Sequence, residues 1–448
     1  MKLPAHPLKT GQAQGGFPYT TNQSENGMVP LEQMNPTRFA TAIQQFSKER
    51  GGMESYLVEL CDRMAEEGFE VHVYAERWAE ENPKIHLHPV RTIPFPKSLR
   101  VLSFAVRATR AIEKGNYPLS LGVGHTLRAD VFQPHGGVHW AWFWRSLEAY
   151  DDRALWILRF LGRILSPAQW VSGWIEGAPC RQKDPPRIIA ISDMVKEDMI
   201  RWYAIPEEKV AVIYNGVDLE RFHPRNHRHG AEIRKRHGVG DEFVLLFVSN
   251  NFRMRGLRHL LGALQDIKRE TFPPFRLIIL GRDRKEPYLR LAKRFGLFRE
   301  VVFVGATEEP EKYYGAADLF IHPSFYDACS LALLEALASG LPVITTAWTG
   351  ASGILNHEKE GWVIDHPADR KALKSAIAYF VDENNRHRAS QLARRKAEAY
   401  SEQESYGKVI RVIQETLENN RSLPGSPALC LSRLNGMGKS VTKVSDDG

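Results

Sequence analysis

From residue 38 onward the chain alternates short apolar runs with amphipathic helical patterns, and few folds accommodate that alternation. Strands that are each followed by a helix pair in parallel, because a parallel connection has to cross over the sheet. The alternation restarts after a turn-rich stretch at residues 215–224. The first series predicts strands over 39–46, 71–74, 85–90, 119–124, 131–133, 188–192 and 210–214, and the second over 243–249, 275–280, 301–304, 319–322 and 342–345.

The two series predict an α/β protein with two Rossmann-like, doubly wound parallel-sheet domains that face each other across a cleft. We expect the N-terminal domain at residues 37–218 and the C-terminal domain at residues 219–401. A helix over residues 402–420 is expected to cross back to the N-terminal domain. Residues 1–36 and 421–448 are polar and rich in small residues, so we predict a disordered N-terminal extension and a disordered tail.

Charge and cysteine usage limit the class of protein further. Lys and Arg exceed Asp and Glu by 60 to 53, a net charge of +7, which favours an anionic partner without indicating nucleic acid. The four cysteines lie far apart without a Cys-x-x-Cys pair, so they suggest neither a zinc site nor a disulfide scaffold, and they fit a cytoplasmic protein. No apolar run approaches the roughly 18 residues that cross a bilayer. The phosphate loop Gly-x-x-x-x-Gly-Lys-Ser/Thr, Gly-x-Gly-x-x-Gly and Gly-x-Ser-x-Gly are all absent.

Residues 318–344 combine a strand, a loop that ends in Asp327, a helix that carries Glu335, and another strand. Free N–H groups at the start of that helix make an anion site. Along a helix the two acids would lie about 12 Å apart, beyond the roughly 5–9.5 Å of glycosidase carboxylate pairs, so we expect them to hold two parts of one extended ligand. In the alternative interpretation, Asp327 only caps the helix and Glu335 is solvated.

This segment resembles the signature of retaining glycosyltransferase family 4, whose members have the GT-B fold. The resemblance rests on Asp327-x7-Glu335 followed by Ala-Leu-Ala-Ser-Gly-Leu-Pro-Val-Ile, and on residues 46–54, 190–196 and 213–218, which are similar to family segments in the family order. It covers roughly residues 38–420. It implies that Asp327 contacts donor-sugar hydroxyls, although the family more often has Glu there, and that Glu335 binds the ribose. It also implies that sugar or phosphate oxygens are held by the backbone amides of Ala328, Cys329, Ser330 and Leu331.

A basic loop after the first strand of the second series carries Arg253, Arg255 and Gly256. No Asp-x-Asp pair is present to hold a metal, so a departing diphosphate would need fixed cations. Arg255 occupies the position where the family usually has Lys, and Arg253 is the nearest second cation. Guanidinium groups suit phosphate. The alternative is an ordinary solvated loop.

In the N-terminal half, a glycine-hinged loop follows the strand at 131–133 and carries His135. The resemblance implies that a histidine here approaches the donor sugar, so we predict His135 as a catalytic residue, with His139 and His125 as lesser candidates. Gly51 and Gly52 would let the backbone approach donor phosphates closely. A structural histidine and an ordinary turn are the alternatives.

Residues 140–165 combine aromatic side chains with an apolar helical stripe from Leu155 to Leu165 and with Arg159 and Arg163 outside that stripe. Such a segment can lie in an anionic membrane interface, or it can form core or a domain contact.

The resemblance implies a glycosyltransferase similar to lipopolysaccharide-core and other cell-envelope enzymes. It would move a hexose from a UDP-linked or related nucleoside-diphosphate sugar to a glycan or glycolipid acceptor, without a cofactor or metal, in the cytoplasm or at the inner face of the cytoplasmic membrane. No nucleic-acid partner is expected. The alternative hypothesis is a non-catalytic GT-B module that binds a nucleotide sugar. It is suggested by Asp327 and Arg255, which depart from the family pattern.

Overall fold

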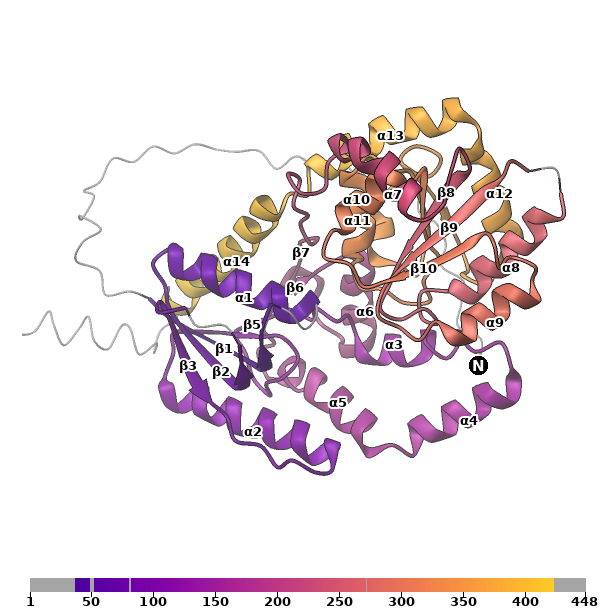
Figure 1. Cartoon of the computed structure of the whole chain (residues 1–448). Coiled ribbons are helices and arrows are strands. Elements are labelled where there is room, and N and C mark those ends of the chain that lie inside the picture. The colour runs from indigo at the N-terminus through magenta and orange to yellow at the C-terminus, as the bar shows by residue number, and fades with distance from the viewer. Residues whose placement is uncertain (1–36, 49–51, 80–81, 271, 423–448) are drawn as a thin grey trace, which may run out of the picture. The chain divides into compact units, whose positions relative to one another are not determined.

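The computed structural model describes residues 37–48, 52–79, 82–270 and 272–422 (Figure 1). The first sheet contains β1 (Arg38–Phe46), β2 (Glu70–Trp78), β3 (Ile85–Pro89), β4 (Leu119–Gly122), β5 (Val131–Phe132), β6 (Arg187–Ala190) and β7 (Val210–Val212). The helices of this half are α1 (Gly52–Glu66), α2 (Lys97–Gly115), α3 (His139–Arg145), α4 (Arg153–Ile164), α5 (Pro167–Gly177) and α6 (Asp193–Tyr203).

The second sheet contains β8 (Phe243–Val248), β9 (Phe275–Leu280), β10 (Val301–Gly305), β11 (Leu319–His322), β12 (Val343–Thr346) and β13 (Gly361–Ile364). Its half adds α7 (Gly230–Arg236), α8 (Leu257–Lys268), α9 (Glu286–Arg294), α10 (Pro310–Ala316), α11 (Leu331–Ala338), α12 (Arg370–Val381), α13 (Glu383–Glu398) and α14 (Glu402–Ser422). Short 3-10 turns lie at η2 (Pro179–Arg181), η3 (Glu207–Lys209), η4 (Pro224–His229) and η5 (Gly350–Ile354).

Both sheets are parallel and share one winding. The first has the order β3-β2-β1-β4-β5-β6-β7 and the second β10-β9-β8-β11-β12-β13. Numbered from its own first strand, each sheet begins 3-2-1-4-5-6, the order of Rossmann-like domains. The order reverses between β1 and β4 and again between β8 and β11, and ligands bind beyond the carboxyl ends of the strands at such switch points. The predicted fold class is therefore confirmed.

The central strand β8 illustrates why the sequence forms this sheet. Its residues are apolar without interruption, as expected for a parallel strand that is covered on both faces. Because side chains alternate along a strand, Val244 and Leu246 pack into one hydrophobic cluster, and Leu245 and Phe247 pack into another.

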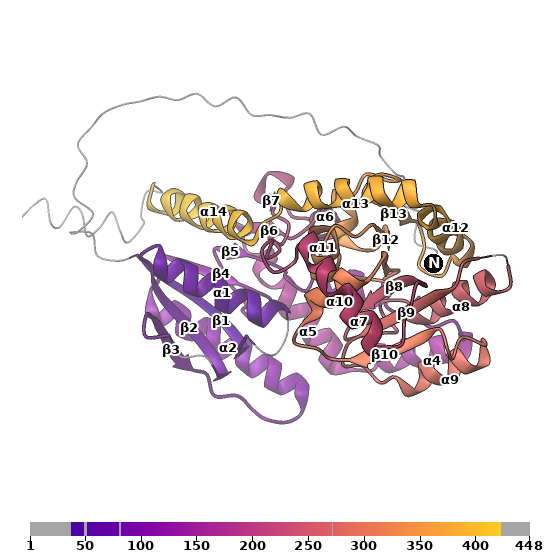
Figure 2. The ribbon, with the colours of Figure 1, turned by 45° about the horizontal axis from the view of Figure 1, so that its top comes forward.

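Helix α14 lies beside α1 in both views of the ribbon (Figures 1 and 2). Its side chains Tyr406, Val409 and Ile413 pack with Phe39 and Leu57 of the first half. The chain therefore returns to the first sheet after it has built the second.

Two features of the second half differ from the sequence prediction. The edge strand β13 was missed, because its four residues include Gly361 and Trp362 and form no apolar run of useful length. Asp327 lies before α11, which begins only at Leu331, so helical rise does not measure its separation from Glu335. Among the described helices, none combines the length and the apolar character that a bilayer crossing requires.

Candidate functional site

Most of the residues that the sequence singled out converge on one cavity of about 590 Å³. It lies beyond the carboxyl ends of β1, β5, β8 and β11, as the two switch points require. The first half contributes Gly52, His135 and Asn215, and the second half contributes Arg255, the loop 326–330 and Glu335. A neighbouring cavity of about 440 Å³ shares Gly52, His135, Asn215 and Glu335 with it and continues toward Arg282 and Thr307. Together they form an extended space lined by both halves.

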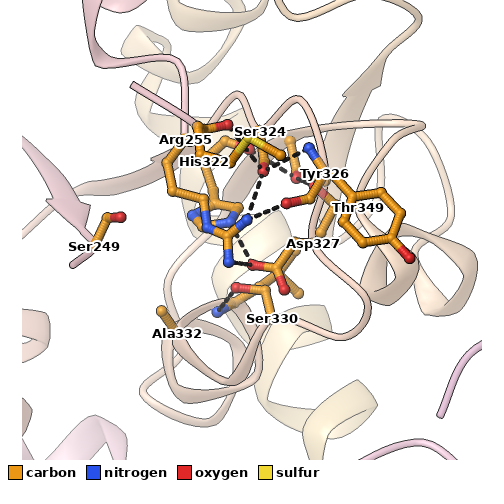
Figure 3. Close-up of polar contacts among 12 residues, drawn as sticks. Ser249, Arg255, His322, Ser324, Tyr326, Asp327, Ser330, Ala332 and Thr349 are labelled. Carbon is orange, nitrogen blue, oxygen red and sulfur yellow. Dashed lines mark hydrogen bonds and ion pairs between the residues drawn. The ribbon is translucent and has the colours of Figure 1, made fainter. Parts of the chain in front are cut away.

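Arg255 and Asp327 form an ion pair at the wall of this cavity (Figure 3). Arg255 Nη2 lies 3.0 Å from Asp327 Oδ2. Arg255 Nη1 donates to Ser324 Oγ at 3.1 Å and to the backbone oxygen of Tyr326. The guanidinium is thus fixed in position before any ligand arrives.

His322, the last residue of β11, approaches Asp327 Oδ2 with Nε2 at 3.0 Å (Figure 3). Burial alone would raise the pKa of Asp327, but Arg255 and His322 outweigh it and hold the pKa below its ordinary value. The ion pair therefore persists at neutral pH and is lost only as the pH falls through that lowered value.

The loop that carries Asp327 is held by backbone and side-chain bonds to the next strand. The N–H of Asp327 donates to Trp348 O at 3.2 Å, and the N–H of Gly350 donates to Asp327 O at 2.7 Å. Thr346 Oγ1 donates to Ser324 O at 2.6 Å. These bonds leave the loop little freedom to move the carboxylate.

Helix α11 begins at this loop, and Ser330 caps it. The Ser330 hydroxyl accepts from Leu333 N at 3.3 Å, so the cap is Ser330 and not Asp327, and the capping interpretation of Asp327 is wrong. The helix ends at Ala338, and Gly340, two residues later, has a φ of +75° that suits glycine. The first residues of the helix, Leu331 and Ala332, line the cavity, and the N–H groups at a helix start suit an anion.

Glu335 projects from α11 into both cavities. Its Oε2 accepts a 2.7 Å hydrogen bond from the hydroxyl of Tyr314. Burial raises the pKa of Glu335, against the effect of that hydrogen bond. It is therefore not a freely solvated helix residue.

Gly256 lets the basic loop pack tightly. It has φ +75°, and a Cβ there would lie 2.1 Å from the backbone oxygen of Pro323. This close approach of two backbones brings Arg255 next to the loop that follows β11.

His135 faces the second half from the loop after β5. Its ring stacks on Tyr56 with centroids 4.3 Å apart, and its Nδ1 has no hydrogen-bond partner among the described residues. Burial lowers the pKa of His135 to about 4, so the imidazole is neutral at pH 7. The residue lines both cavities, although its Nδ1 is itself covered by protein.

The two halves touch at the site through three hydrogen bonds to the loop 326–329. Tyr326 Oη accepts from Val138 N at 2.8 Å, and Ser192 Oγ donates to Ala328 O at 2.7 Å. Asn215 Nδ2 donates to Cys329 O at 3.4 Å. These contacts fix the first half against the loop that carries Asp327.

Some predicted residues lie elsewhere. Arg253 lines neither cavity; its guanidinium lies 4.3 Å from the ring centroid of Tyr150. The lesser candidates His139 and His125 also line neither of these cavities. Gly51 falls outside the described residues, whereas Gly52 lines both cavities.

Sequence reasoning missed His322, Tyr326 and Asn215 as site residues. His322 and Tyr326 flank the predicted acid in the same short segment, so their proximity to Asp327 was the available signal. The contacts of Tyr326 and Asn215 with the other half depend on packing that no local pattern encodes.

Two family models match the chain. The model described as "Glycosyltransferase Family 4" matches residues 50–221, and the one described as "Glycosyl transferases group 1" matches residues 230–396. The first match covers β2 to β7 of the first sheet, and the second match covers all six strands of the second sheet.

The proteins of similar sequence include named glycosyltransferases. The chain is 23% identical to the lipopolysaccharide glucosyltransferase WaaG of Escherichia coli over 330 residues, which are 73% of this chain and 85% of that protein. It is 26% identical to the D-inositol 3-phosphate glycosyltransferase of Pseudarthrobacter chlorophenolicus over 357 residues, 73% of this chain and 81% of that one.

Solved structures agree in fold. The crystal structure of WaaG superposes with a TM-score of 0.69 at 20% identity and covers 84% of this chain and 99% of its own. The Anabaena protein HepE in complex with UDP-glucose gives a TM-score of 0.60 at 17% identity, with 85% and 99% covered. Because the two family models together span both halves, the chain belongs to glycosyltransferase family 4, and it is a glycosyltransferase enzyme with the GT-B fold.

Proposed function

We propose that this glycosyltransferase moves a hexose or related sugar, with retention of configuration and without a metal ion, from a UDP-linked sugar to a cell-envelope glycan or lipid-linked acceptor. The observation that carries the proposal is the shared cavity. Arg255, Asp327, the start of α11 and Glu335 line it from the second half, and His135 lines it from the first. A nucleotide sugar is extended in the same way, with a ribose, two phosphates and a sugar ring in sequence.

Each part of the donor has a matching group. Glu335 faces the cavity toward Arg282 and Thr307, and we assign it to the ribose hydroxyls. The N–H groups at the start of α11 and Arg255 suit the diphosphate. Asp327 then receives the sugar hydroxyls. The solved complex of HepE with UDP-glucose supports a UDP-linked donor, and the name of WaaG supports an acceptor related to lipopolysaccharide.

The transfer breaks the bond between the sugar C1 and the diphosphate oxygen and forms a bond from C1 to the acceptor oxygen. The acceptor proton passes to the departing phosphate on the same face, so configuration is retained without a protein nucleophile. Arg255 stabilises the negative charge that develops on the leaving group. His135, whose imidazole is neutral at pH 7, lines the cavity from the first half and is assigned to a hydroxyl of the donor sugar.

Incubation with radiolabelled UDP-glucose, other sugar nucleotides and a bacterial membrane-lipid extract tests the proposal. We expect one donor to label a lipid or glycan product, and NMR of that product to report the same anomeric configuration as the donor. Saturable donor binding with neither transfer nor slow hydrolysis would instead identify a non-catalytic module.

Glu335→Gln is expected to weaken UDP binding about tenfold or more, because charge-assisted hydrogen bonds to the ribose are worth about 1.5–3 kcal/mol. Isothermal titration calorimetry with UDP measures the effect. Glu286→Gln, an exposed carboxylate at the start of α9, is the matched control and should bind UDP like the wild type. Unchanged affinity in Glu335→Gln would remove this residue from the site.

Exposed apolar side chains on α4 and α5 support the proposal that the acceptor is bound to a membrane. None of the α4 residues is buried, and Leu158 and Leu165 are 65% and 78% exposed. The interpretation of this stripe as core is therefore wrong. Trp170 and Trp174 of α5 add exposed aromatic area.

An ordinary surface helix turns its apolar face toward the protein, whereas α4 turns its apolar face outward. Arg163 donates to Phe143 O and Ser146 Oγ, and the Arg159 guanidinium lies 5.8 Å from the ring centroid of Tyr150. Arg163 thus faces the protein, whereas Arg159 is exposed and the leucines face outward. We propose that this apolar surface inserts into the membrane interface and brings the active site to a lipid-linked acceptor.

The double variant Leu158→Glu/Leu161→Glu is expected to reduce binding to phosphatidylcholine–phosphatidylglycerol vesicles by at least about tenfold, because burial of each leucine is worth roughly 1.5–3 kcal/mol. Vesicle co-sedimentation measures this. Phe298→Glu, at an apolar side chain of similar exposure in the second half, should leave vesicle binding unchanged. Equal binding by both variants would contradict membrane insertion of α4.

A further inference from the structure

A second cluster of polar side chains lies at the edge of the first sheet, away from the cavity that holds Arg255 and Asp327. Glu70 and His72 lie on β2, and His86 and His88 lie on the edge strand β3. Glu70 begins β2 and His86 is the second residue of β3, so these two residues lie at the amino-terminal ends of their strands. The transfer site lies beyond the carboxyl ends, at the opposite end of the sheet.

Strand register brings these side chains to one face. In the parallel pair, His72 is the partner of His86, and Tyr74 is the partner of His88. Glu70 precedes His72 by two residues, so it points to the same side. The sequence signal is Glu-x-His at 70–72 and His-x-His at 86–88, which only pairing of the two strands unites.

The distances match those between the ligands of a tetrahedral divalent ion. Glu70 Oε1 lies 3.0 Å from His72 Nε2 and 3.9 Å from His86 Nε2, and all three ligand atoms lie within 4.8 Å of one another. Ligands about 2.0–2.1 Å from a tetrahedral zinc ion are roughly 3.3 Å apart. The ring of His86 stacks on that of His72 with centroids 4.7 Å apart, and the exposed His86 side chain would have to rotate to bring the set to that spacing.

His88 orients the buried member of the cluster. His72 Nδ1 and His88 Nε2 lie 2.9 Å apart. When His72 donates its Nδ1–H to His88, its Nε2 lone pair faces the Glu70 carboxylate, and a cation between them satisfies both acceptors. Metal-bound histidines commonly donate their second N–H in this way.

The arginine beside this cluster, Arg38, does not form an ion pair with Glu70. Arg38 is the register partner of Glu70, but its guanidinium lies 4.5 Å from the ring centroid of Tyr117 and donates to Gly115 O. The Glu70 carboxylate is turned toward the histidines instead.

We propose that Glu70, His72 and His86 bind a divalent transition-metal ion of the zinc class, with His88 as the positioning residue. Two imidazoles and one carboxylate form a ligand set typical of such ions. His86 is half exposed, so the fourth position is open to water. The ion ties β2 to the edge strand β3 and stabilises the first half, independently of the transfer reaction.

The test is calorimetric titration of Zn²⁺ into untagged full-length protein that has been freed of metal by dialysis against a chelator. We expect stoichiometric binding, a higher Tm with Zn²⁺, and the visible absorption of a four-coordinate ion when Co²⁺ is used. Glu70→Gln and His86→Ala should each weaken Zn²⁺ binding by at least about tenfold and abolish the rise in Tm. His88→Ala should weaken binding about 10- to 100-fold, the usual effect of losing such a partner.

His357→Ala is the matched control. His357 Nε2 lies 3.6 Å from Glu358 Oε1. The substitution therefore removes an exposed histidine–carboxylate pair that has no third ligand within the part of the chain that the structure describes. It should bind Zn²⁺ like the wild type. Absence of stoichiometric binding, or equal affinity in Glu70→Gln and the wild type, would overturn the proposal of a metal site. Neither result would bear on the proposed sugar transfer, which takes place at the other end of the sheet.

Discussion

Arg255→Ala is expected to slow sugar transfer by about 10²- to 10³-fold, which corresponds to roughly 2.7–4 kcal/mol of lost transition-state stabilisation. The Arg255 guanidinium is fixed by Asp327, Ser324 and Tyr326 at the cavity wall, so it needs no rearrangement when charge develops on the leaving diphosphate. Steady-state kinetics with the identified donor should show most of the loss in kcat, because the interaction strengthens in the transition state.

Arg253→Ala is the matched control for this experiment. Arg253 carries the same charge on the same loop, but it packs on Tyr150 and lines neither cavity. It should retain transfer within about twofold, as expected of a group that makes no contact at the reacting centre. If the two variants lost activity equally, the general positive charge of the loop would matter and the fixed position of Arg255 would not.

Features of this site that depend on the order of strands and loops along the chain can be predicted from the sequence, whereas contacts that depend on packing cannot. Asp327, Glu335 and Arg255 could be predicted to converge, because parallel winding brings the loops after β8 and β11 to adjacent positions at one sheet edge. The ion pair between Arg255 and Asp327 could not, since it depends on Gly256 packing against Pro323.

Packing between distant elements accounts for the other differences. The sequence of α4 shows an apolar stripe, but periodicity does not say whether that stripe faces inward or outward. The outward orientation is set by Arg163, which donates to a backbone oxygen 20 positions earlier and to a side-chain oxygen 17 positions earlier. The histidines of β2 and β3 likewise form a cluster only through strand register.

The ion pair joins the two residues that depart from the family pattern. At the position of Asp327 the family more often has the longer Glu, and at the position of Arg255 it usually has the shorter Lys. Here the short acid meets the long cation at 3.0 Å. We infer that the shorter acid and the longer cation compensate each other in side-chain length, so that the two charged groups still meet across the same distance.

This inference predicts a coupling between Asp327→Glu and Arg255→Lys. Asp327→Glu adds a methylene against a guanidinium that Ser324 and Tyr326 hold in place, and Arg255→Lys removes the fork that reaches all three acceptors. Each single variant is expected to lower kcat/KM about 100-fold, because a misplacement of about 1 Å at a reacting centre can cost that much.

The double variant Asp327→Glu/Arg255→Lys restores the combined reach with the long acid and the short cation. We expect its kcat/KM to exceed the additive expectation by about tenfold, a coupling of roughly 1.4 kcal/mol, which is within the range for residues in direct contact. Urea denaturation of all three variants separates this coupling from a change in stability. If the losses simply added, Asp327 and Arg255 would act independently on the donor, and the reach of the pair would not explain why this chain carries both exchanges.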